Sequence, residues 1–514
     1  MRTKNSFLNF LANTGSHLLN VVLSFLCRTV FIHTLSQEYL GINGLFGNIL
    51  TVLNLAELGV GSAIIFHIYK PIAEGNEEEQ LELMNLYRIL YRLIACFIAI
   101  AGVALVPFLD YLIKDQPDIP ELTWIYLLYL FNTVSSYLFS YKRAIIDAHQ
   151  KQYVGTIINT VFTTLQFLLQ MLVLVLTHNF IIYLLIQILC NIFTNIIVAH
   201  QADKMYPFLR RDRKVLPSKS TRKDIYKNVG AMFIHKVGSV VVNDTDNLIM
   251  STFVGIVSVG IYSNYQMIQY SINVALNGVF GAFTASIGNL GAIQEKKKLF
   301  EVYNTLQFLG FWLYGFCTVA FVVLYNPFIE VWAGKDFLFP MSVVLVICAC
   351  FYVSGNRVVT LTFRDAMGLY WYDRYKPFFE IVINLVASLY LVNHIGTAGI
   401  FIGTLISTFT TSWWIEPFVT YKYGFGQPIR YFFRDYFKYA FTTVTVGGFT
   451  YWLCDHLVMG GVLEVILKGV LCVSVYNGVI LLLYYRTSNF KNLWDRVMIL
   501  VKERSAKSAK SKGE

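Results

Sequence analysis

Long apolar stretches separated by short polar segments recur along the whole of this 514-residue chain. Each stretch holds about twenty or more residues, the length that an α-helix needs to cross the hydrocarbon core of a bilayer. The pattern predicts an all-α integral membrane protein with about 14 transmembrane helices, near residues 7–33, 39–66, 89–113, 122–141, 153–177, 179–199, 228–254, 259–291, 300–324, 338–363, 377–393, 396–420, 436–454 and 462–485. The loops between them are too short for a soluble catalytic domain. The chain also lacks a G-x-x-x-x-G-K-[ST] phosphate loop, which disfavours an ATP-driven pump.

A weak internal repeat lies on either side of the polar segment 200–227. Leu40-Gly41-Ile42 aligns with Val259-Gly260-Ile261 across this segment, and the same offset aligns Ala56 with Ala275. Repeats of this kind place a substrate site at the interface between their halves and move by rocking about it. We therefore expect two six-helix lobes in parallel repeat, followed by a final helix pair.

The predicted domains follow from this division. They are an N-lobe (1–199, spans 1–6), a cytoplasmic basic linker (200–227), a C-lobe (228–420, spans 7–12), a C-terminal helix pair (421–486, spans 13–14) and a cytoplasmic tail (487–514). In the tail, apolar residues from Phe490 to Val501 recur at helical spacing beside basic residues, which is typical of an amphipathic helix on a membrane surface. The last residues, 505–514, are predicted to be disordered.

Composition and charge support the membrane assignment and indicate its orientation. Charged residues make up 14% of the chain, whereas soluble domains carry roughly a quarter. The net charge of +10 raises nucleic-acid binding as an alternative, but its location excludes that class. Of 41 Lys and Arg residues, only Lys114 and Lys335 lie in outside loops and four lie within spans, which leaves 35 in or beside the cytoplasmic segments. This asymmetry satisfies the positive-inside rule with both termini cytoplasmic, so anionic headgroups are the expected partner.

Polar side chains inside the spans are the candidate functional residues, because a charge at bilayer depth costs about 2.5–3.5 kcal/mol and must face protein or water. In the first span five of them advance by three or four residues and share one helical face. They are Asn13, His17, Asn20, Ser24 and Arg28. We interpret this stripe as the lining of a wet cavity; hydrogen bonding between helices is the alternative.

The second span places Asn54 and Glu57 on one face. Glu57 is a candidate proton or sodium site. A carboxyl kept neutral by burial, or paired with a Lys or Arg, is the alternative.

The seventh span is the most heavily charged, with His235, Lys236, Asn243, Asp244 and Asp246. Asp244-Thr245-Asp246 also resembles the D-x-D motif with which glycosyltransferases hold a metal. On a helix, however, these carboxylates point about 200° apart, so they could share a metal only if the helix broke there. We instead expect Asp246 to face the cavity.

Two arginines complete the set of candidates. Aligning the repeats puts Arg28 over Asn247, next to Asp246, so we expect Arg28 and Asp246 to pair when the outer side of the cavity closes. Arg357 follows Ser354-Gly355-Asn356 near a span end and is a candidate substrate ligand. Snorkelling to headgroups is the alternative for Arg357.

The eight cysteines lie almost entirely within spans and form no C-x-x-C pair, so we interpret them as small packing residues. We expect no metal and no cofactor. Coupling to a proton or sodium gradient through Glu57, Asp244 or Asp246 is a hypothesis that the sequence leaves open.

Several sequence blocks resemble those of bacterial polysaccharide-repeat-unit flippases. L-G-I-N-G-L-F (40–46) continuing to L-N-L-A-E-L-G-V-G-S-A (53–63) resembles their second span. The same holds for Asp246-Asn247 followed by V-G-I-Y-S-N-Y (259–265), and for G-L-Y-W (368–371) running into Lys376-Pro377 and Glu380. The chain is therefore similar to the oligosaccharide flippase family within the multidrug/oligosaccharidyl-lipid/polysaccharide exporter superfamily.

The resemblance implies a non-enzymatic transporter that works by alternating access around a cavity lined by spans 1, 2, 7 and 8. Its implied substrate is a short oligosaccharide on undecaprenyl pyrophosphate, moved to the outer leaflet of the bacterial plasma membrane for capsule, O-antigen or exopolysaccharide synthesis. Polysaccharide polymerase and chain-length machinery are the implied protein partners. A pyrophosphate carries about two negative charges, so its cavity needs cations that are not fully neutralised. The expected substrate-binding residues are Asn13, His17, Asn20, Ser24, Arg28, Asn54, His235, Lys236, Asn243 and Arg357.

Three other functions are weighed against this one. A multidrug-type cation antiporter would favour carboxylates and aromatics without basic residues, so Arg28 and Lys236 argue against it. A polysaccharide polymerase or acyltransferase would be a membrane enzyme, and polymerases of this pathway need a large, Arg-rich outside loop that is not present. A structural scaffold would not need charges at bilayer depth.

Overall fold

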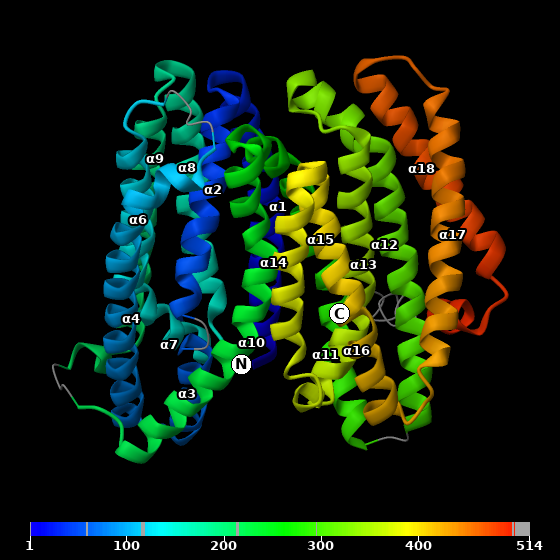
Figure 1. Cartoon of the computed structure of the whole chain (residues 1–514). Helices are drawn as coiled ribbons and strands as arrows, with labels where there is room; N and C mark the ends of the chain where they lie inside the picture. The colour runs from blue at the N-terminus through cyan, green and yellow to red at the C-terminus, as the bar shows by residue number, and fades with distance from the viewer. Residues whose placement is uncertain are drawn as a thin grey trace, which may run out of the picture. The chain divides into compact units, whose positions relative to one another are not determined.

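The computed structural model describes residues 2–57, 60–114, 119–211, 215–293, 296–495 and 498, and these residues contain α-helices and no β-strand. Figure 1 labels the helices. They are α1 (Arg2–Thr34), α2 (Gln37–Leu53), α3 (Val60–Glu74), α4 (Glu77–Leu105), α5 (Leu109–Leu112), α6 (Leu122–Phe139), α7 (Arg143–Ala148), α8 (Gln152–Thr177), α9 (Phe180–Met205), α10 (Lys219–Ile249), α11 (Ile256–Ile293), α12 (Lys296–Trp332), α13 (Met341–Ala366), α14 (Lys376–Ile395), α15 (Thr397–Thr410), α16 (Ser412–Val419), α17 (Arg430–Asp455) and α18 (Gly461–Tyr484).

Contacts between helices divide the chain into two compact units, Met1–Ser263 and Asn264–Glu514. The division falls within α11, beyond the end of the predicted N-lobe. One reason is that α10 packs on α2 and α3, which belong to the first unit. The lobe bounds derived from the repeat, 1–199 and 228–420, stay a prediction.

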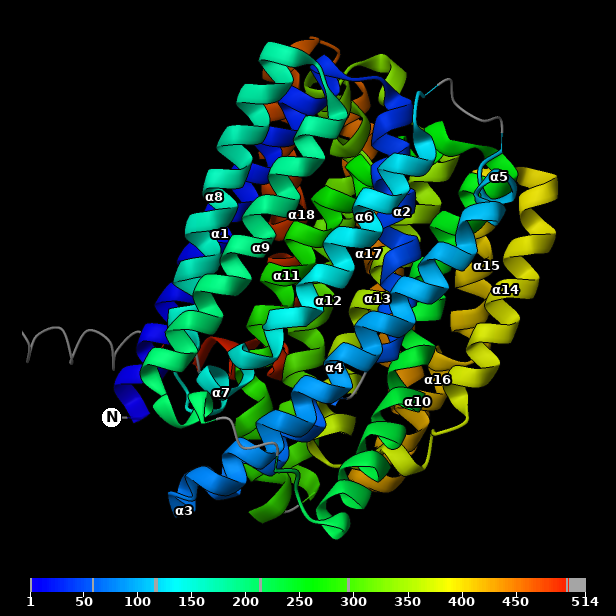
Figure 2. The same ribbon diagram turned by 90° about the vertical axis from the view of Figure 1, so that its left-hand side faces the viewer.

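In the first unit, α1 packs along α8, α8 along α9, and α6 contacts both α4 and α9. Figure 2 shows α8, α9 and α6 running side by side. Polar caps define where helices begin: the side chain of Asn76 accepts the backbone N–H of Glu79 at the start of α4, and that of Asn179 accepts the N–H of Ile181 at the start of α9. These bonds satisfy donors that the first turn of a helix leaves without partners.

The second predicted span, 39–66, is broken rather than continuous. Helix α2 ends at Leu53, a 3-10 turn η1 (Asn54–Glu57) follows, and α3 begins at Val60. Asn54, Gly59 and Gly61 are weak helix formers, and their clustering favours an interruption at this point. The break places Glu57 at the junction of two helices.

The two aligned members of the internal repeat meet where α2 passes the start of α11. A Cβ on Gly260 would lie 2.7 Å from the carbonyl oxygen of Gln37 and 3.0 Å from the amide nitrogen of Gly41. A Cβ on Gly41 would overlap the carbonyl oxygen of Ile256. Glycine at both positions therefore permits contact between backbones.

In the second unit, α12 packs on α13, α17 and α18, and α14 pairs closely with α15. The predicted span 396–420 is also interrupted. It consists of α15, which ends at Thr410, the short α16, and a π-helical turn η8 (Thr420–Phe425). Glu416 lies on α16, between the two irregularities.

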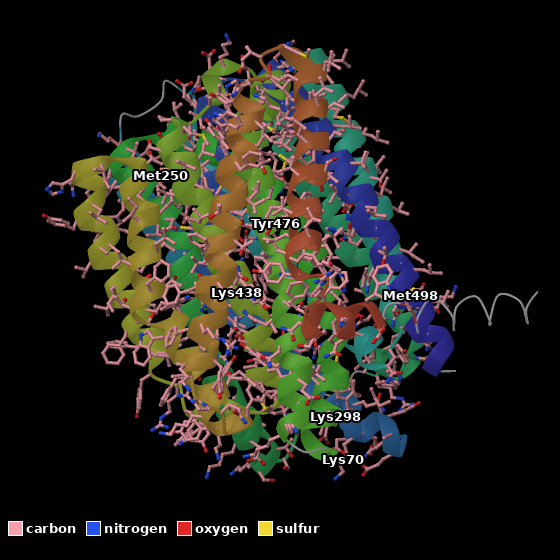
Figure 3. All side chains as sticks on the ribbon, turned by 90° about the vertical axis from the view of Figure 1, so that its right-hand side faces the viewer. Lys70, Met250, Lys298, Lys438, Tyr476 and Met498 are labelled. Carbon is pink, nitrogen blue, oxygen red and sulfur yellow. The ribbon has the colours of Figure 1, made fainter. Side chains whose placement is uncertain are left out.

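The structure confirms an all-α membrane protein. Ten helical segments in the described part of the chain are long and apolar enough to cross a bilayer. The exposed face of α17 and α18, toward which Figure 3 looks, carries large apolar side chains: Phe441 is 74% exposed and Leu482 is 75% exposed. Four predicted spans are not among the ten, namely 39–66, 228–254, 259–291 and 436–454. The total of 14 and the cytoplasmic termini stay predictions.

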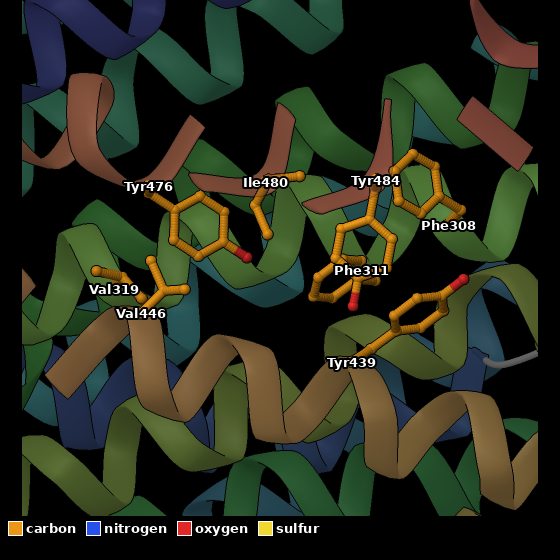
Figure 4. Packing of buried hydrophobic residues seen from close by; sticks show 8 residues of the cluster. All are labelled: Phe308, Phe311, Val319, Tyr439, Val446, Tyr476, Ile480 and Tyr484. Atoms are coloured by element: carbon orange, nitrogen blue, oxygen red, sulfur yellow. The ribbon is translucent and has the colours of Figure 1, made fainter. Parts of the chain in front are cut away.

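An aromatic cluster fastens the C-terminal helices to the second unit (Figure 4). Phe311 of α12 stacks on Tyr439 of α17 with ring centroids 4.3 Å apart, and Tyr484 of α18 packs against both. Residues 488–495 are helical, as the amphipathic pattern predicts, and Phe490 and Leu493 pack on this cluster. Part of the apolar face of this helix therefore contacts protein rather than lipid. Residues 496, 497 and 499–514 lie outside the described residues.

Candidate functional site

Glu57 lies at the junction of α2 and α3 and is bound by tyrosines. Tyr91 of α4 donates a hydrogen bond to its Oε1, and Tyr137 of α6 donates one to its Oε2 at 2.9 Å. Tyr87, one turn before Tyr91, donates to the Tyr91 hydroxyl at 2.9 Å. Among the described side chains, none forms an ion pair with Glu57. The predicted alternative of a Lys or Arg partner therefore finds no support in this part of the structure.

We call Tyr87, Tyr91 and Tyr137 the tyrosine cage. Their rings meet edge to face, with centroids 4.4 Å apart for Tyr87 and Tyr91 and 5.5 Å apart for Tyr91 and Tyr137. The Tyr137 hydroxyl also lies 3.0 Å from Oδ1 of Asn54. Gly61 leaves space for the cage, because a Cβ there would approach the Tyr87 hydroxyl to 2.8 Å. The predicted residues Asn54 and Glu57 are thus brought together through Tyr137.

Arg28 is a half-buried cation without a carboxylate partner among the described residues. Its Nη2 donates to Oγ of Ser263 at 2.8 Å, and its Nε is buried without a partner in the described structure. None of the described carboxylates forms an ion pair with it. Asp246 is buried, 7% exposed, and engaged in an interaction. The expected pairing of Arg28 with Asp246 stays a prediction.

The polar stripe of α1 divides into two parts. Toward the N-terminus, Asn13 accepts a hydrogen bond from Thr156 of α8 at 3.0 Å, which is the interhelical bonding considered as the alternative. Further along, His17 is half-buried, and Oδ1 of Asn20 is buried without a partner in the described structure. Ser24 donates to a carbonyl of its own helix. The second part of the stripe therefore contains a buried hydrogen-bond acceptor, Oδ1 of Asn20, without a partner in the described structure.

The candidate residues of the seventh span lie on α10. The side chains of His235, Lys236, Asn243 and Asp244 are outside the described residues. Helix α10 is unbroken through positions 244–246. This continuity is what the argument against a shared D-x-D metal requires.

Arg357 belongs to an ion-pair cluster with Lys376, Glu380 and Glu416. Its Nε and Nη2 donate to the two carboxylate oxygens of Glu416 at 3.0 and 2.7 Å. Lys376 donates to the same carboxylate, and Glu380 lies 3.8 Å from Arg357 and 3.9 Å from Lys376. The Glu416 side chain is 0% exposed. The two positive and two negative charges balance, and Arg357 does not snorkel to headgroups.

Sequence reasoning did not identify the tyrosine cage or three members of the ion-pair cluster. Glu416 and Glu380 both lie within predicted spans, so the rule that a charge at bilayer depth needs a partner would have identified them. Lys376 and Glu380 are also spaced as an i,i+4 pair. The cage had no comparable signal, because the chain contains 33 tyrosines.

The second unit also contains an apolar cavity of about 460 Å³ between α12, α13 and α17. Val319, Leu345, Tyr352 and Val444 are among its lining residues, and none of the lining residues is charged. Its chemistry suits a hydrocarbon chain rather than a sugar or an ion.

Comparisons with known proteins give a family and a fold. The family model described as polysaccharide biosynthesis protein matches residues 6–284. No curated protein matches the sequence significantly. The lipid II flippase MurJ, in an inward closed conformation, superposes on 93% of this chain and 99% of its own, with a TM-score of 0.64 and 13% identity.

Two MATE transporters share the fold, one of them a multidrug resistance transporter. An inward-facing member of the MOP superfamily covers 78% of this chain and 94% of its own, with a TM-score of 0.60 and 15% identity. A mutant of the Vibrio cholerae MATE transporter VcmN covers 84% of this chain and 100% of its own, with a TM-score of 0.55 and 14% identity. At such identities the likeness shows the fold alone, which is that of membrane transporters.

Proposed function

The chain belongs to the polysaccharide biosynthesis protein family, and from this premise we propose that it is a flippase for lipid-linked oligosaccharides. Its substrate would be an oligosaccharide repeat unit on undecaprenyl pyrophosphate, moved across the bacterial plasma membrane by alternating access. The product would supply capsule, O-antigen or exopolysaccharide synthesis. The fold shared with the lipid II flippase MurJ supports a lipid-linked substrate.

Arg28 is the observation that carries this proposal. A guanidinium at bilayer depth is costly unless it serves an anion, and Arg28 has a single hydrogen bond, to Ser263, in the described structure. Its planar donors match the oxygens of a phosphate, which would accept from the unpartnered Nε. Asn20 on the same helix has an unpartnered amide oxygen suited to a sugar hydroxyl. We propose that His17, Asn54, His235, Lys236 and Asn243 are further substrate ligands, together with Arg28 and Asn20.

The lipid portion of the substrate needs an apolar path. The 460 Å³ cavity of the second unit has no charged lining residue and is a candidate seat for part of a polyprenyl chain. Anionic headgroups would be held by the basic cytoplasmic segments. Polysaccharide polymerase and chain-length proteins are the proposed partners that consume the product.

Net export needs energy or continuous removal of the product. Glu57, Asp244 and Asp246 are the carboxylates through which a proton or sodium gradient would act. Cation antiport is the second candidate function, favoured by the MATE-like fold and by the carboxylate of Glu57. Arg28 distinguishes the two, because an uncompensated cation repels a cationic drug and attracts a pyrophosphate.

Deletion of the gene and complementation test the proposal. Without the protein, intact lipid-linked repeat units should accumulate on the inner leaflet, whereas accumulation of flipped, unpolymerised units would indicate a polymerase and contradict it. Arg28→Ala should fail to complement, and Arg28→Lys should complement partially, because lysine keeps the positive charge but lacks the planar set of donors of a guanidinium. Arg92→Ala is the matched control, since Arg92 is exposed on α4 and should complement fully.

A further inference from the structure

A small polar pocket lies at one end of the second unit, where the first turns of α12 and α17 meet η8 and the helical segment after α18. Its lining includes Asn304 and Gln307 from α12, Asp435 and Tyr439 from α17, and Asn489 from the last segment. The distribution of basic residues assigns this end to the cytoplasmic side. The volume of the pocket is about 10 Å³, which is room for a single group of the size of a water molecule.

The pocket contains a buried acceptor without a donor. Gln307 is 7% exposed, and its Oε1 is buried without a partner in the described structure. A buried acceptor of this kind costs free energy unless another group donates a hydrogen bond to it. The group that fits the pocket is therefore expected to be a hydrogen-bond donor.

A carboxylate in the same pocket indicates that this donor is positively charged. Asp435 is half-buried; its Oδ1 accepts a hydrogen bond from Nε of Arg434 at 2.9 Å, and its other oxygen has no partner among the described side chains. Tyr421 and Tyr436 are among the aromatic residues of the lining, and aromatic rings attract cations. A water molecule can donate to the oxygens, but only a cation also gains from the carboxylate charge and the rings.

The volume of the pocket separates a primary ammonium from other cations. A primary ammonium is about as large as a water molecule and donates hydrogen bonds from its nitrogen. A guanidinium or a trimethylammonium group has several heavy atoms and exceeds the space available. A metal ion has no hydrogen to donate, and in the described part of the chain no group of three His, Cys, Asp or Glu side chains could hold one.

Two basic side chains of α17 stand beside the pocket. Arg434 and Lys438 are four residues apart, so they share a helical face next to Asp435, and both are exposed. Lys438, labelled in Figure 3, lies 4.8 Å from the centre of the Tyr484 ring and forms no ion pair with a described carboxylate. The two cations repel a free metal or ammonium ion and attract a phosphate. A ligand that carries both an ammonium and a phosphate therefore matches the site.

We propose that this pocket binds the headgroup of phosphatidylethanolamine from the cytoplasmic leaflet. The ammonium donates to Oε1 of Gln307 and to the carboxylate of Asp435, and the phosphate pairs with Arg434 and Lys438. A short ethylene link joins the two charges of this headgroup, so both fall within about one turn of α17. Asp435 also directly precedes the predicted span 436–454, which is the depth of lipid headgroups. The inference goes beyond the proposed function and does not depend on it.

A lipid bound here connects three parts of the second unit. Gln307 belongs to α12 and Asp435 to α17. Asn489, in the segment after α18, lies 3.5 Å from the Tyr439 hydroxyl, to which it donates, and the neighbouring Phe490 packs on the aromatic cluster. Because the pocket exists only when these parts are packed together, a lipid that binds it stabilises the folded protein.

Thermal unfolding of the purified, full-length protein in detergent tests the proposal. The micelles are supplemented with phosphatidylethanolamine, phosphatidylcholine or phosphatidylglycerol with identical acyl chains, and the unfolding midpoint is measured against lipid concentration. We expect phosphatidylethanolamine to raise the midpoint at lower concentration than the other two lipids. The trimethylammonium of phosphatidylcholine is too large for the pocket, and phosphatidylglycerol has no amine.

Substitutions in the pocket locate the effect. Asp435→Asn removes the charge that holds the ammonium and should raise the phosphatidylethanolamine concentration for half of the effect by about tenfold or more. Gln307→Leu removes the acceptor at similar size and should act in the same direction, whereas Gln307→Glu keeps an acceptor and should retain the preference. Asp455→Asn is the matched control, because Asp455 is exposed at the opposite end of α17 and should leave the preference unchanged.

Four results would overturn the proposal. Equal stabilisation by the three lipids would mean that the pocket holds only water, and a preference for phosphatidylglycerol would mean that the basic residues bind anionic lipids in general. A preference for phosphatidylethanolamine that survives in Asp435→Asn would place the lipid elsewhere. Ammonium chloride that stabilises the wild type as strongly as the lipid would make the pocket a site for a free cation. If Gln307→Leu does not fold, the comparison of lipids on the wild type and Asp435→Asn carry the test.

Discussion

Two glutamates lie at interrupted helices, and the protein surrounds them with different partners. Glu57, at the break between α2 and α3, is solvated by phenol hydroxyls and has no ion pair with any described side chain. Glu416, on the short helix between α15 and η8, is held by Arg357 and Lys376. The first carboxylate accepts hydrogen bonds from neutral donors, whereas the second is held by two cations.

The difference separates a site that can change state from one that holds structure. Neutralising Glu416 would leave Arg357 and Lys376 with Glu380 as their remaining partner in the cluster, and the cost of this unbalanced positive charge favours the ionised form of Glu416. Neutralising Glu57 leaves no uncompensated charge among the described side chains. A transporter needs both kinds of site: groups whose contacts can change between states, and ion pairs that hold neighbouring helices together.

The largest effect is expected at the fixed site. Glu416→Ala removes the carboxylate shared by Arg357 and Lys376 and should destabilise the protein by about 3–5 kcal/mol, the cost of breaking a buried ion pair. Thermal unfolding of the purified protein in detergent measures it. Glu74→Ala is the control, since the Lys70–Glu74 pair is exposed and should contribute less than about 1 kcal/mol. Equal losses in the two variants would contradict the structural role of Glu416.

A double substitution sharpens the same point. Arg357→Met combined with Glu416→Met removes the bidentate pair together, and Lys376 can still pair with Glu380 at 3.9 Å. We expect the double variant to be more stable than either single variant, because buried pairs can often be replaced by apolar groups at little cost. A double-mutant cycle on unfolding free energies should give a coupling of about 0.5–3 kcal/mol. Additive effects would show that the two residues do not interact.

A smaller effect is expected in the tyrosine cage. Tyr137→Phe removes one hydroxyl and should cost about 0.5–1.5 kcal/mol, the usual net contribution of a hydrogen bond. Gly61→Ala should also destabilise the cage, because the added methyl group would displace the Tyr87 hydroxyl. Unfolding midpoints of both variants, compared with that of Tyr126→Phe, a control on the same helix as Tyr137 but outside the cage, measure these effects. A loss of stability as large as that of Glu416→Ala would mean that the cage, like the ion-pair cluster, holds the structure together.

The smallest effect on stability is expected at Glu57 itself. Glu57→Gln keeps an acceptor oxygen and a side chain of the same length, so the free energy of unfolding should change by less than about 1 kcal/mol. The same change should abolish any dependence of transport on the proton gradient. A strongly destabilised Glu57→Gln would indicate an ionised carboxylate held by a cation, and would remove the contrast with Glu416.

The sequence predicted the elements that composition controls and missed those that depend on tertiary contacts. Apolar length was sufficient to place most spans. Asn54 and Glu57 were predicted on one face of a continuous helix; in the structure they lie on the η1 turn and both contact Tyr137. The breaks after Leu53 and Thr410 were not predicted, because each lies inside a stretch whose overall apolar length suffices for a single span. Tyr91 and Tyr137 lie far from Glu57 in the chain, so only the packing of α4 and α6 against η1 could reveal the cage.

Arg28 and Arg357 also show that the partners of a charged residue cannot be predicted from the sequence. Both are single arginines in apolar spans, and the same rule selected both as substrate ligands. The structure gives Arg357 two carboxylates and gives Arg28 the hydroxyl of Ser263. Sequence alone does not reveal which intramembrane cations are neutralised.

Transport in proteoliposomes tests the central claim most directly. Vesicles containing the protein and undecaprenyl-pyrophosphate-linked oligosaccharide, with a fluorophore on the sugar, report leaflet position through a membrane-impermeant quencher. We expect a proton gradient to accelerate movement of the label in the wild type, its collapse to return the slow rate, and Glu57→Gln to stay slow in both conditions. Equal wild-type rates with and without the gradient, or an intact gradient response in Glu57→Gln, would contradict the account.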